Sequence, residues 1–320
     1  MNSPHAPPTR RPWPRHLVVL FLAALLTFAP PAPAQSTGHE WRFGFSARAF
    51  IGINENDAKA ATRVWAQTVG REKNLRVHPE ARTYRSVEEI AQALRQGAVD
   101  MVVLSAPEYL ALDPQIRPTD LISQTGIEGE EYVLLAGVAG GITNPAGVCG
   151  RTLYLQDGFR SSLALPWLDT LLLAAGRGPS GESVGKIELA HKPTQAVLPV
   201  FFGKADACLV SQSAYDTMTE MNPQIRQRLR LIARSPKFLS AFMVLRLDLE
   251  ADLKRTIASA MGELHQSPAG AQILSLFQGQ PLAKMPLSVL DSARAMLAQR
   301  EQLLSDRERS TSAAGGGPTP

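Results

Sequence analysis

The sequence predicts an α/β protein with two lobes, each a mostly parallel sheet covered by helices. Its 320 residues leave room for about two domains of roughly 150 residues. The apolar fraction of 44% and the charged fraction of 19% are ordinary for a globular chain. Apolar segments with a strand pattern alternate with segments of helical periodicity, in two successive sets. Disordered, collagen-like and disulfide-knot proteins are excluded.

Residues 1–34 have the three regions of a cleavable secretory signal. A polar start containing the Arg10-Arg11 pair precedes an unbroken apolar stretch at 17–28, and Ala32 and Ala34 provide the small residues of a cleavage site. The stretch is shorter than the about 20 residues that a membrane span needs, although an N-terminal membrane anchor stays an alternative. The arginine pair leaves general secretion and twin-arginine export both open. We expect export to a Gram-negative periplasm.

The charge and the motifs exclude several function classes. The chain carries 33 basic and 29 acidic residues, and residues 1–34 hold three arginines and no acid, so the remainder has 30 against 29, or +1. This balance argues against nucleic-acid binding. The sequence lacks a P-loop, an H-E-x-x-H motif and clustered histidines. We therefore expect no enzyme, no catalytic residue, no metal and no cofactor.

The first set of elements occupies 38–112. Asn54 is placed to cap a helix through Val69, and Ser86 with Glu89 forms the pattern of a capping box. The run at 101–104 is apolar throughout, as in a buried parallel strand. The expected strands lie at 38–47, 75–79 and 100–105, and the expected helices at 54–69, at 86–97 and from Pro107.

A second set follows a strand at 131–138. The expected strands lie at 151–155, 186–190, 207–210, 229–233 and 241–245, and the expected helices at 163–175, 194–203, 214–221, 249–264, 269–277 and 287–304. Residues 305–320 are charged and then rich in Ser, Thr, Ala, Gly and Pro, which predicts a disordered tail.

Five motifs in order carry a resemblance to a known family over nearly all of residues 40–300. They are Phe43-Gly44-Phe45, the segment 84–97, the segment 100–110, the segment 150–166 and the segment 203–208. The chain resembles the periplasmic phosphate/phosphonate-binding solute receptors of ABC transporters, which have the type 2 periplasmic binding protein fold. The family's phosphonate loop has Gly-aromatic after its serines, whereas Leu163-Ala164 follows Ser161-Ser162 here.

The resemblance implies a chain that crosses twice between its lobes. Lobe 1 would hold 38–133 plus 237–304, lobe 2 would hold 134–236, and the strands near 131–138 and 229–245 would form a two-strand hinge. In lobe 2 the strand at 151–155 would neighbour the strand at 207–210. Cys149 and Cys208 would then stand on adjacent strands, which makes a disulfide possible, while two buried thiols stay the alternative.

One candidate site lies at the start of the helix 163–175. Ser161 and Ser162 stand where free backbone N–H groups and the helix dipole favour an anion, and Arg160 can add a charged contact. Simple N-capping by a serine is the alternative interpretation.

Further candidates follow the other strands, where ligands bind in open α/β sheets. They are Arg48, Phe50, Ser105, Tyr109, Ser211 and Gln212. Glu130 and Glu131 open the hinge, and we expect both to be solvated.

The resemblance implies a solute-binding component of an ABC importer. It would bind a small, anionic, phosphate- or phosphonate-like solute between the lobes by hinge closure and deliver it, as a monomer, to an inner-membrane ABC permease. The alternative is a periplasmic adaptor that presents its closed form to a membrane-bound sensor.

Overall fold

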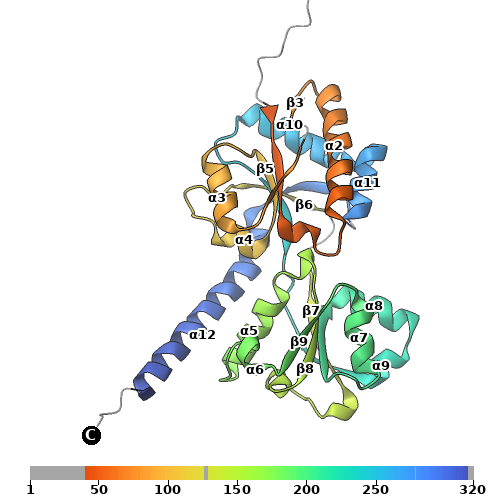
Figure 1. Cartoon of the computed structure of the whole chain (residues 1–320), viewed down its shortest axis with the longest axis vertical. Coiled ribbons are helices and arrows are strands. Elements are labelled where there is room, and N and C mark those ends of the chain that lie inside the picture. Colours follow the sequence, from red (N-terminus) through yellow and green to blue (C-terminus); the bar gives the residue numbers. More distant parts are fainter. Residues whose placement is uncertain (1–39, 79, 126–128, 278, 316–320) are drawn as a thin grey trace, which may run out of the picture. The chain divides into compact units, whose positions relative to one another are not determined.

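A computed structural model describes residues 40–78, 80–125, 129–277 and 279–315. Within them the chain forms two main sheets, each with helices packed on both faces (Figure 1). The prediction of a two-lobed α/β fold is confirmed. The expected signal peptide at 1–34 and the last residues of the expected tail, 316–320, lie outside the described residues.

The larger sheet has six strands in the order β13-β6-β12-β5-β2-β4. Its strands are β2 (Phe43–Ser46), β4 (Arg82–Tyr84), β5 (Met101–Ser105), β6 (Asp120–Gln124), β12 (Ala241–Leu245) and β13 (Leu282–Met285). The helices α2 (Glu55–Glu72), α3 (Val87–Arg95), α4 (Ala106–Ala111), α10 (Ala251–Gly262) and α11 (Pro268–Leu276) accompany it, with the short 3₁₀ helices η1 (Ala47–Phe50) and η5 (Leu264–Gln266). Two short strands, β1 (Glu40–Trp41) and β3 (Arg76–Val77), pair separately.

The smaller sheet has five strands in the order β11-β7-β10-β8-β9. Its strands are β7 (Tyr132–Gly137), β8 (Thr152–Gln156), β9 (Lys186–Ala190), β10 (Ala207–Ser211) and β11 (Leu229–Arg234). The elements between them are η2 (Val138–Gly140), η3 (Pro145–Val148), η4 (Phe159–Ser161), α5 (Ala164–Ala174), α6 (Ser180–Ser183), α7 (Pro193–Phe201), α8 (Gln212–Met221) and α9 (Gln224–Arg228). The last described elements are η6 (Leu287–Leu290) and α12 (Asp291–Gly315).

Local sequence explains the helix starts. The Asn54 side chain accepts the N–H groups of Asn56 and Asp57 at the start of α2. The Ser86 hydroxyl accepts the N–H of Glu89, and the Glu89 carboxylate in turn accepts the N–H of Arg85 at 2.7 Å. Each contact satisfies a backbone donor that a helix start leaves without an internal partner.

Alternating strand residues fix which helices cover which face. In the six-stranded sheet, Phe43, Phe45 and Met101 share a core with Trp65 of α2 and Met261 of α10. The same face is adjacent to α11, which packs on α2 (Figure 1). The site described below lies on this face.

Both sheets are mixed but mostly parallel, as expected: four of the six strands in the larger sheet and four of the five in the smaller sheet run in the same direction. β2 runs parallel to β4 and β5, but β12 lies antiparallel between β5 and β6. In the other sheet β8, β9 and β10 are parallel, and β7 is antiparallel to β10 and β11. The path of the chain explains the exceptions. Strands joined by helical crossovers run parallel, whereas β7 and β12 each enter their sheet directly from the other half and run antiparallel to their neighbours.

Two segments connect the sheets, one between β6 and β7 and one between β11 and β12. They pair with each other: the Glu130 N–H donates to the Phe238 carbonyl at 2.8 Å, and the Phe238 N–H donates back at 2.9 Å. Gly129 has φ +130°, and a Cβ there would lie 2.7 Å from the Phe238 carbonyl carbon. The hinge was expected near 131–138 and 229–245, and the connecting residues 235–240 fall within the second range. β7 lies within the five-stranded sheet, and the paired residues 129–131 directly precede it.

α12 differs from the expectation of a disordered tail over residues 305–315, which are helical. Local contacts explain this, because the Ser310 hydroxyl donates to the Asp306 carbonyl and Arg309 pairs with Asp306 one turn away. Arg307 also reaches Glu182 beside α6 at 2.8 Å.

The cysteines are both free, which corrects the possible disulfide. The strand neighbourhood was predicted correctly, because Ala207 pairs with Leu153 in parallel β8 and β10. However, Cys208 is level with Tyr154, five positions beyond Cys149. At about 3.3 Å per residue this offset is on the order of 15 Å, beyond the about 7 Å between Cα atoms that a disulfide can bridge.

Candidate functional site

A cavity of about 320 Å³ lies on the α2, α10 and α11 face of the six-stranded sheet. Residues of the five-stranded half, in the loop from Gln156 to Ser161, complete its lining. Because both halves contribute residues, a solute in this cavity would contact each of them.

The part of the lining formed by the six-stranded half is mainly apolar. Strands contribute Phe43, Phe45, Met101, Val103, Ile122, Met243 and Leu282, and helices contribute Trp65, Met261, Leu264, Ile273, Leu274 and Leu276. The Phe45 and Phe277 rings stack at 5.9 Å between centroids. Phe159, from η4, is half-buried against this same core.

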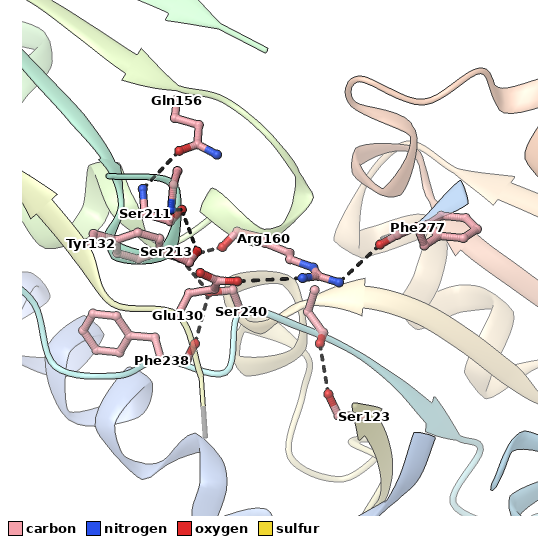
Figure 2. Close-up of polar contacts among 12 residues, drawn as sticks. Ser123, Glu130, Tyr132, Gln156, Arg160, Ser211, Ser213, Phe238, Ser240 and Phe277 are labelled. Atoms are coloured by element: carbon pink, nitrogen blue, oxygen red, sulfur yellow. Dashed lines mark hydrogen bonds and ion pairs between the residues drawn. The ribbon is translucent and has the colours of Figure 1, made fainter. Parts of the chain in front are cut away.

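The polar end of the cavity is organised around Arg160. Its guanidinium lies 3.8 Å from a carboxylate oxygen of Glu130 and donates to the Phe277 carbonyl at 3.2 Å (Figure 2). Arg160 belongs to the five-stranded half, Glu130 to the connecting segment and Phe277 to the end of α11. This side chain therefore joins three parts of the fold at one point.

Burial changes the acid–base behaviour of this pair. Burial raises the pKa of Glu130 above its ordinary value, although Arg160 and a hydrogen bond with Ser213 act in the opposite direction. Burial likewise lowers the pKa of Arg160, against the attraction of Glu130. Each charge is costly to bury and is stabilised by its partner, so the pair can respond to a third charged group.

Buried hydroxyl groups hold the loop that carries Arg160. The Tyr132 hydroxyl donates to the Arg160 carbonyl at 2.6 Å and lies 2.6 Å from the Ser240 hydroxyl. Ser162 donates to the Ser240 carbonyl at 3.2 Å. The Arg160 backbone is thus fixed from both β7 and the segment before β12.

The structure brings only some of the sequence-predicted residues together. Arg160 and Ser161 line the cavity. Ser162 lies beside it, with its hydroxyl directed at Ser240. α5 begins after Leu163 without a side-chain cap, so neither serine caps this helix as the alternative interpretation supposed.

The candidates after β5 are part of the core. The Ser105 hydroxyl donates to the Glu108 carboxylate at 2.7 Å within the capping box of α4. Tyr109 is 2% exposed, its hydroxyl donates to the Pro118 carbonyl and its ring packs against Phe242. Neither residue lines the cavity.

The remaining candidates also lie away from the cavity lining. Arg48 is exposed, and Phe50 is buried against Phe45. The Ser211 hydroxyl accepts the Ala214 N–H at the start of α8, and Gln212 donates to Asp216.

Glu130 is the main residue that sequence reasoning missed. We expected a solvated side chain, but the Glu130 side chain is only 18% exposed and lines the cavity. The acidic pair Glu130-Glu131 immediately before a fully apolar strand was the available signal, since one of two adjacent residues entering a sheet must turn inward.

The comparisons with known proteins agree with this architecture. The sequence matches the family model described as "ABC transporter, phosphonate, periplasmic substrate-binding protein" over residues 54–285. A comparison with curated protein sequences found no match. Among the described residues, none of the helices combines the length and apolar character of a membrane span.

Solved structures share the fold at low sequence identity. A Xanthomonas citri protein bound to chloride ion is 15% identical, with a TM-score of 0.58 over 83% of this chain and 99% of its own. The methylphosphonate complex of PhnD1 from Prochlorococcus marinus is 13% identical, with a TM-score of 0.53 over 80% and 97% of the two chains.

A binding component of an ABC phosphonate transporter from Pseudomonas aeruginosa is 13% identical, with a TM-score of 0.50 over 86% and 98%. The matched family model spans most of the described chain, including the five-stranded sheet, every strand of the six-stranded sheet except β2, and the connecting segments. The chain therefore belongs to the periplasmic phosphonate-binding family, the substrate-binding proteins of ABC transporters.

Proposed function

We propose that this protein captures a small anionic solute at the Arg160 end of the cavity and delivers it to an ABC permease in the inner membrane. Membership of a periplasmic family implies a periplasmic location. The same proposal includes export through a signal peptide at 1–34. It also includes a division into lobe 1, at 38–133 plus 237–304, and lobe 2, at 134–236. The family consists of transporter components, which favours a permease over a membrane-bound sensor as the partner.

The observation that carries the proposal is the position of Arg160. A guanidinium presents several N–H donors in a plane and binds phosphonate or sulfonate oxygens in pairs. Here it stands at a point lined by both halves of the fold, and Ser161, the next residue in the chain, also lines the cavity. An anion that displaces Glu130 from Arg160 would hold the two halves together, which is how hinge-closing binding proteins retain a ligand.

Calorimetry tests the proposal on protein that has been unfolded and refolded to remove any bound solute. Methylphosphonate, phosphate, phosphite and methanesulfonate are titrated into the wild-type protein and into Arg160→Met. We expect binding of at least one anion and a loss of at least tenfold in the variant, about 1.4 kcal/mol.

The control is Arg255→Met, an exposed arginine of α10 that pairs with Asp252 one turn away on the same helix. It should bind like wild type. Equal affinities in the wild-type and Arg160→Met proteins would contradict the proposed role of Arg160.

A further inference from the structure

We propose that the solute is amphiphilic, with an apolar chain or ring that occupies the inner part of the cavity while its anionic group meets Arg160. The inference rests on the proposed function for the charged end. It adds the chemical class of the rest of the molecule: an alkyl or aryl phosphonate or sulfonate in place of a fully polar anion.

The distribution of charge along the lining is the first support. Among the described lining residues, the acidic and basic side chains are Glu130, Asp157, Arg160 and His191. All four come from the connecting segment or the five-stranded half. The six-stranded half contributes aromatic and aliphatic side chains, and its few polar ones are uncharged. An apolar group buried there gains free energy, whereas a second charge would lack a partner.

The size of the cavity is the second support. Native cores contain few voids larger than a water molecule. An apolar cavity of about 150 Å³ is already large enough to take up a small aromatic guest. The cavity of about 320 Å³ exceeds what a methylphosphonate-sized anion at Arg160 would fill.

The burial pattern of α11 is the third support. Ile273, Leu274 and Phe277 are apolar, line the cavity and are only half-buried, whereas Met261 and Leu264 on neighbouring elements are buried. Half-buried apolar side chains that face a cavity are available to a ligand at little cost in reorganisation. These side chains can contact the apolar chain of a solute that enters beside the stacked Phe45 and Phe277 rings.

The fourth observation is a polar atom in this apolar part of the lining. Among the residues that the structure describes, the buried side-chain oxygen of Gln124, at the end of β6, has no hydrogen-bond partner, and Gln124 lines the cavity. A hydroxyl or amide N–H on the solute's chain would satisfy this acceptor.

Titration of a homologous series tests the inference. Methyl-, butyl- and octylphosphonate have the same head and differ in apolar length. Each buried methylene should strengthen binding by about fourfold, so we expect octylphosphonate to bind at least tenfold more tightly than methylphosphonate. Equal affinity along the series would overturn the amphiphilic ligand and leave the proposed function standing.

An uncharged probe separates the two proposals. If 1-octanol bound as tightly as octylphosphonate, the apolar cavity would be supported and the anionic head of the proposed function would be overturned. If neither a phosphonate of any length nor octanol bound, both proposals would be contradicted.

A cavity-filling variant tests where the alkyl chain of the solute binds. Ile273→Trp places a large side chain in the inner cavity and should remove the gain in affinity from methyl- to octylphosphonate, read as the ratio of the two affinities within the variant. Ala271→Trp, at an exposed position of the same helix, is the matched control and should keep the full gain. A chain-length gain that persisted in Ile273→Trp would overturn this location. The wild-type series decides the ligand class even if Ile273→Trp does not fold.

Discussion

Arg160 and Glu130 illustrate what residue-scale reasoning can and cannot predict. The sequence indicated Arg160 and Ser161, because a basic and a hydroxyl side chain precede a helix that follows a strand. It did not indicate Glu130, whose inward position depends on the pairing of 129–131 with 235–240, over a hundred residues away. For the same reason Tyr109 was misjudged: its hydroxyl partner, Pro118, is set by the path of a loop.

Glu130 should make anion binding dependent on pH. A bound anion adds to the burial that already raises the pKa of Glu130, so binding is accompanied by proton uptake. Affinity for methanesulfonate, whose charge is constant, should therefore rise as pH falls from neutral towards the pKa of Glu130. Glu130→Gln should flatten this profile and bind at least about fivefold more tightly at neutral pH, roughly 1 kcal/mol.

The matched control for this prediction is Glu131→Gln, the adjacent residue, whose carboxylate lies 3.7 Å from Arg234. The affinity of Glu131→Gln for methanesulfonate should change with pH as steeply as that of the wild-type protein.

The stability of the unliganded protein provides a second measurement. Because the folded-state pKa of Glu130 is raised from 4.5, its contribution is present below pH 4.5 and is lost as pH rises through the folded-state value. The free energy of unfolding of Glu130→Gln, measured with denaturant, should not show this loss as pH rises.

At the scale of elements, the long or strongly patterned segments were predicted and the short ones were missed. The helix caps at Asn54 and Ser86 and the apolar run of β5 were recognised because each carries a local signal. β4, β6 and β13 were not, since three to five residues with few large apolar side chains give little periodicity. The antiparallel insertion of β12 was also missed, because strand order is decided by long-range pairing.

The connecting segments give an element-scale prediction. Gly129→Ala places a Cβ 2.7 Å from the Phe238 backbone at a φ of +130°, so the pairing of the two segments must shift. We expect a loss of about 1–3 kcal/mol in the free energy of unfolding, measured with denaturant. Gly140→Ala, where an added Cβ meets no atom within 4 Å, is the control and should change stability by less than about 0.5 kcal/mol. A Gly129→Ala protein as stable as Gly140→Ala would show that the pairing does not require glycine.

At the scale of the whole molecule, one hydrophobic cluster extends through both sheets. It includes Val102 and Leu104 of the six-stranded sheet, Phe238 of a connecting segment, and Leu134 and Trp167 of the five-stranded half. α12 contributes Ala293 and Met296 to the same cluster and packs on α5. The sequence predicted two similar halves but could not show that their cores are joined.

The ion pair between α12 and α5 gives a prediction at this scale. Arg300 lies 2.9 Å from the buried carboxylate of Asp169, and Arg300→Met would leave that charge without its cation. We expect a loss of about 3 kcal/mol, with a single unfolding transition retained because the cluster is continuous. Arg309→Met, an exposed arginine of the same helix, should cost at most about 0.5 kcal/mol. Equal thermal midpoints for the two variants would contradict this account.

The position of β12 has a consequence for how the chain matures during synthesis. All five strands of the smaller sheet come from one continuous stretch, so that sheet can assemble as soon as β11 has been made. The larger sheet cannot, because β12 lies at its centre, between β5 and β6, and is made more than a hundred residues later. Until then both of these strands present unpaired edges, the feature that promotes association with other chains. A nascent chain of this protein is therefore about three quarters made before its larger sheet can close, and the last quarter, which supplies β12 and β13, decides whether it reaches the folded state.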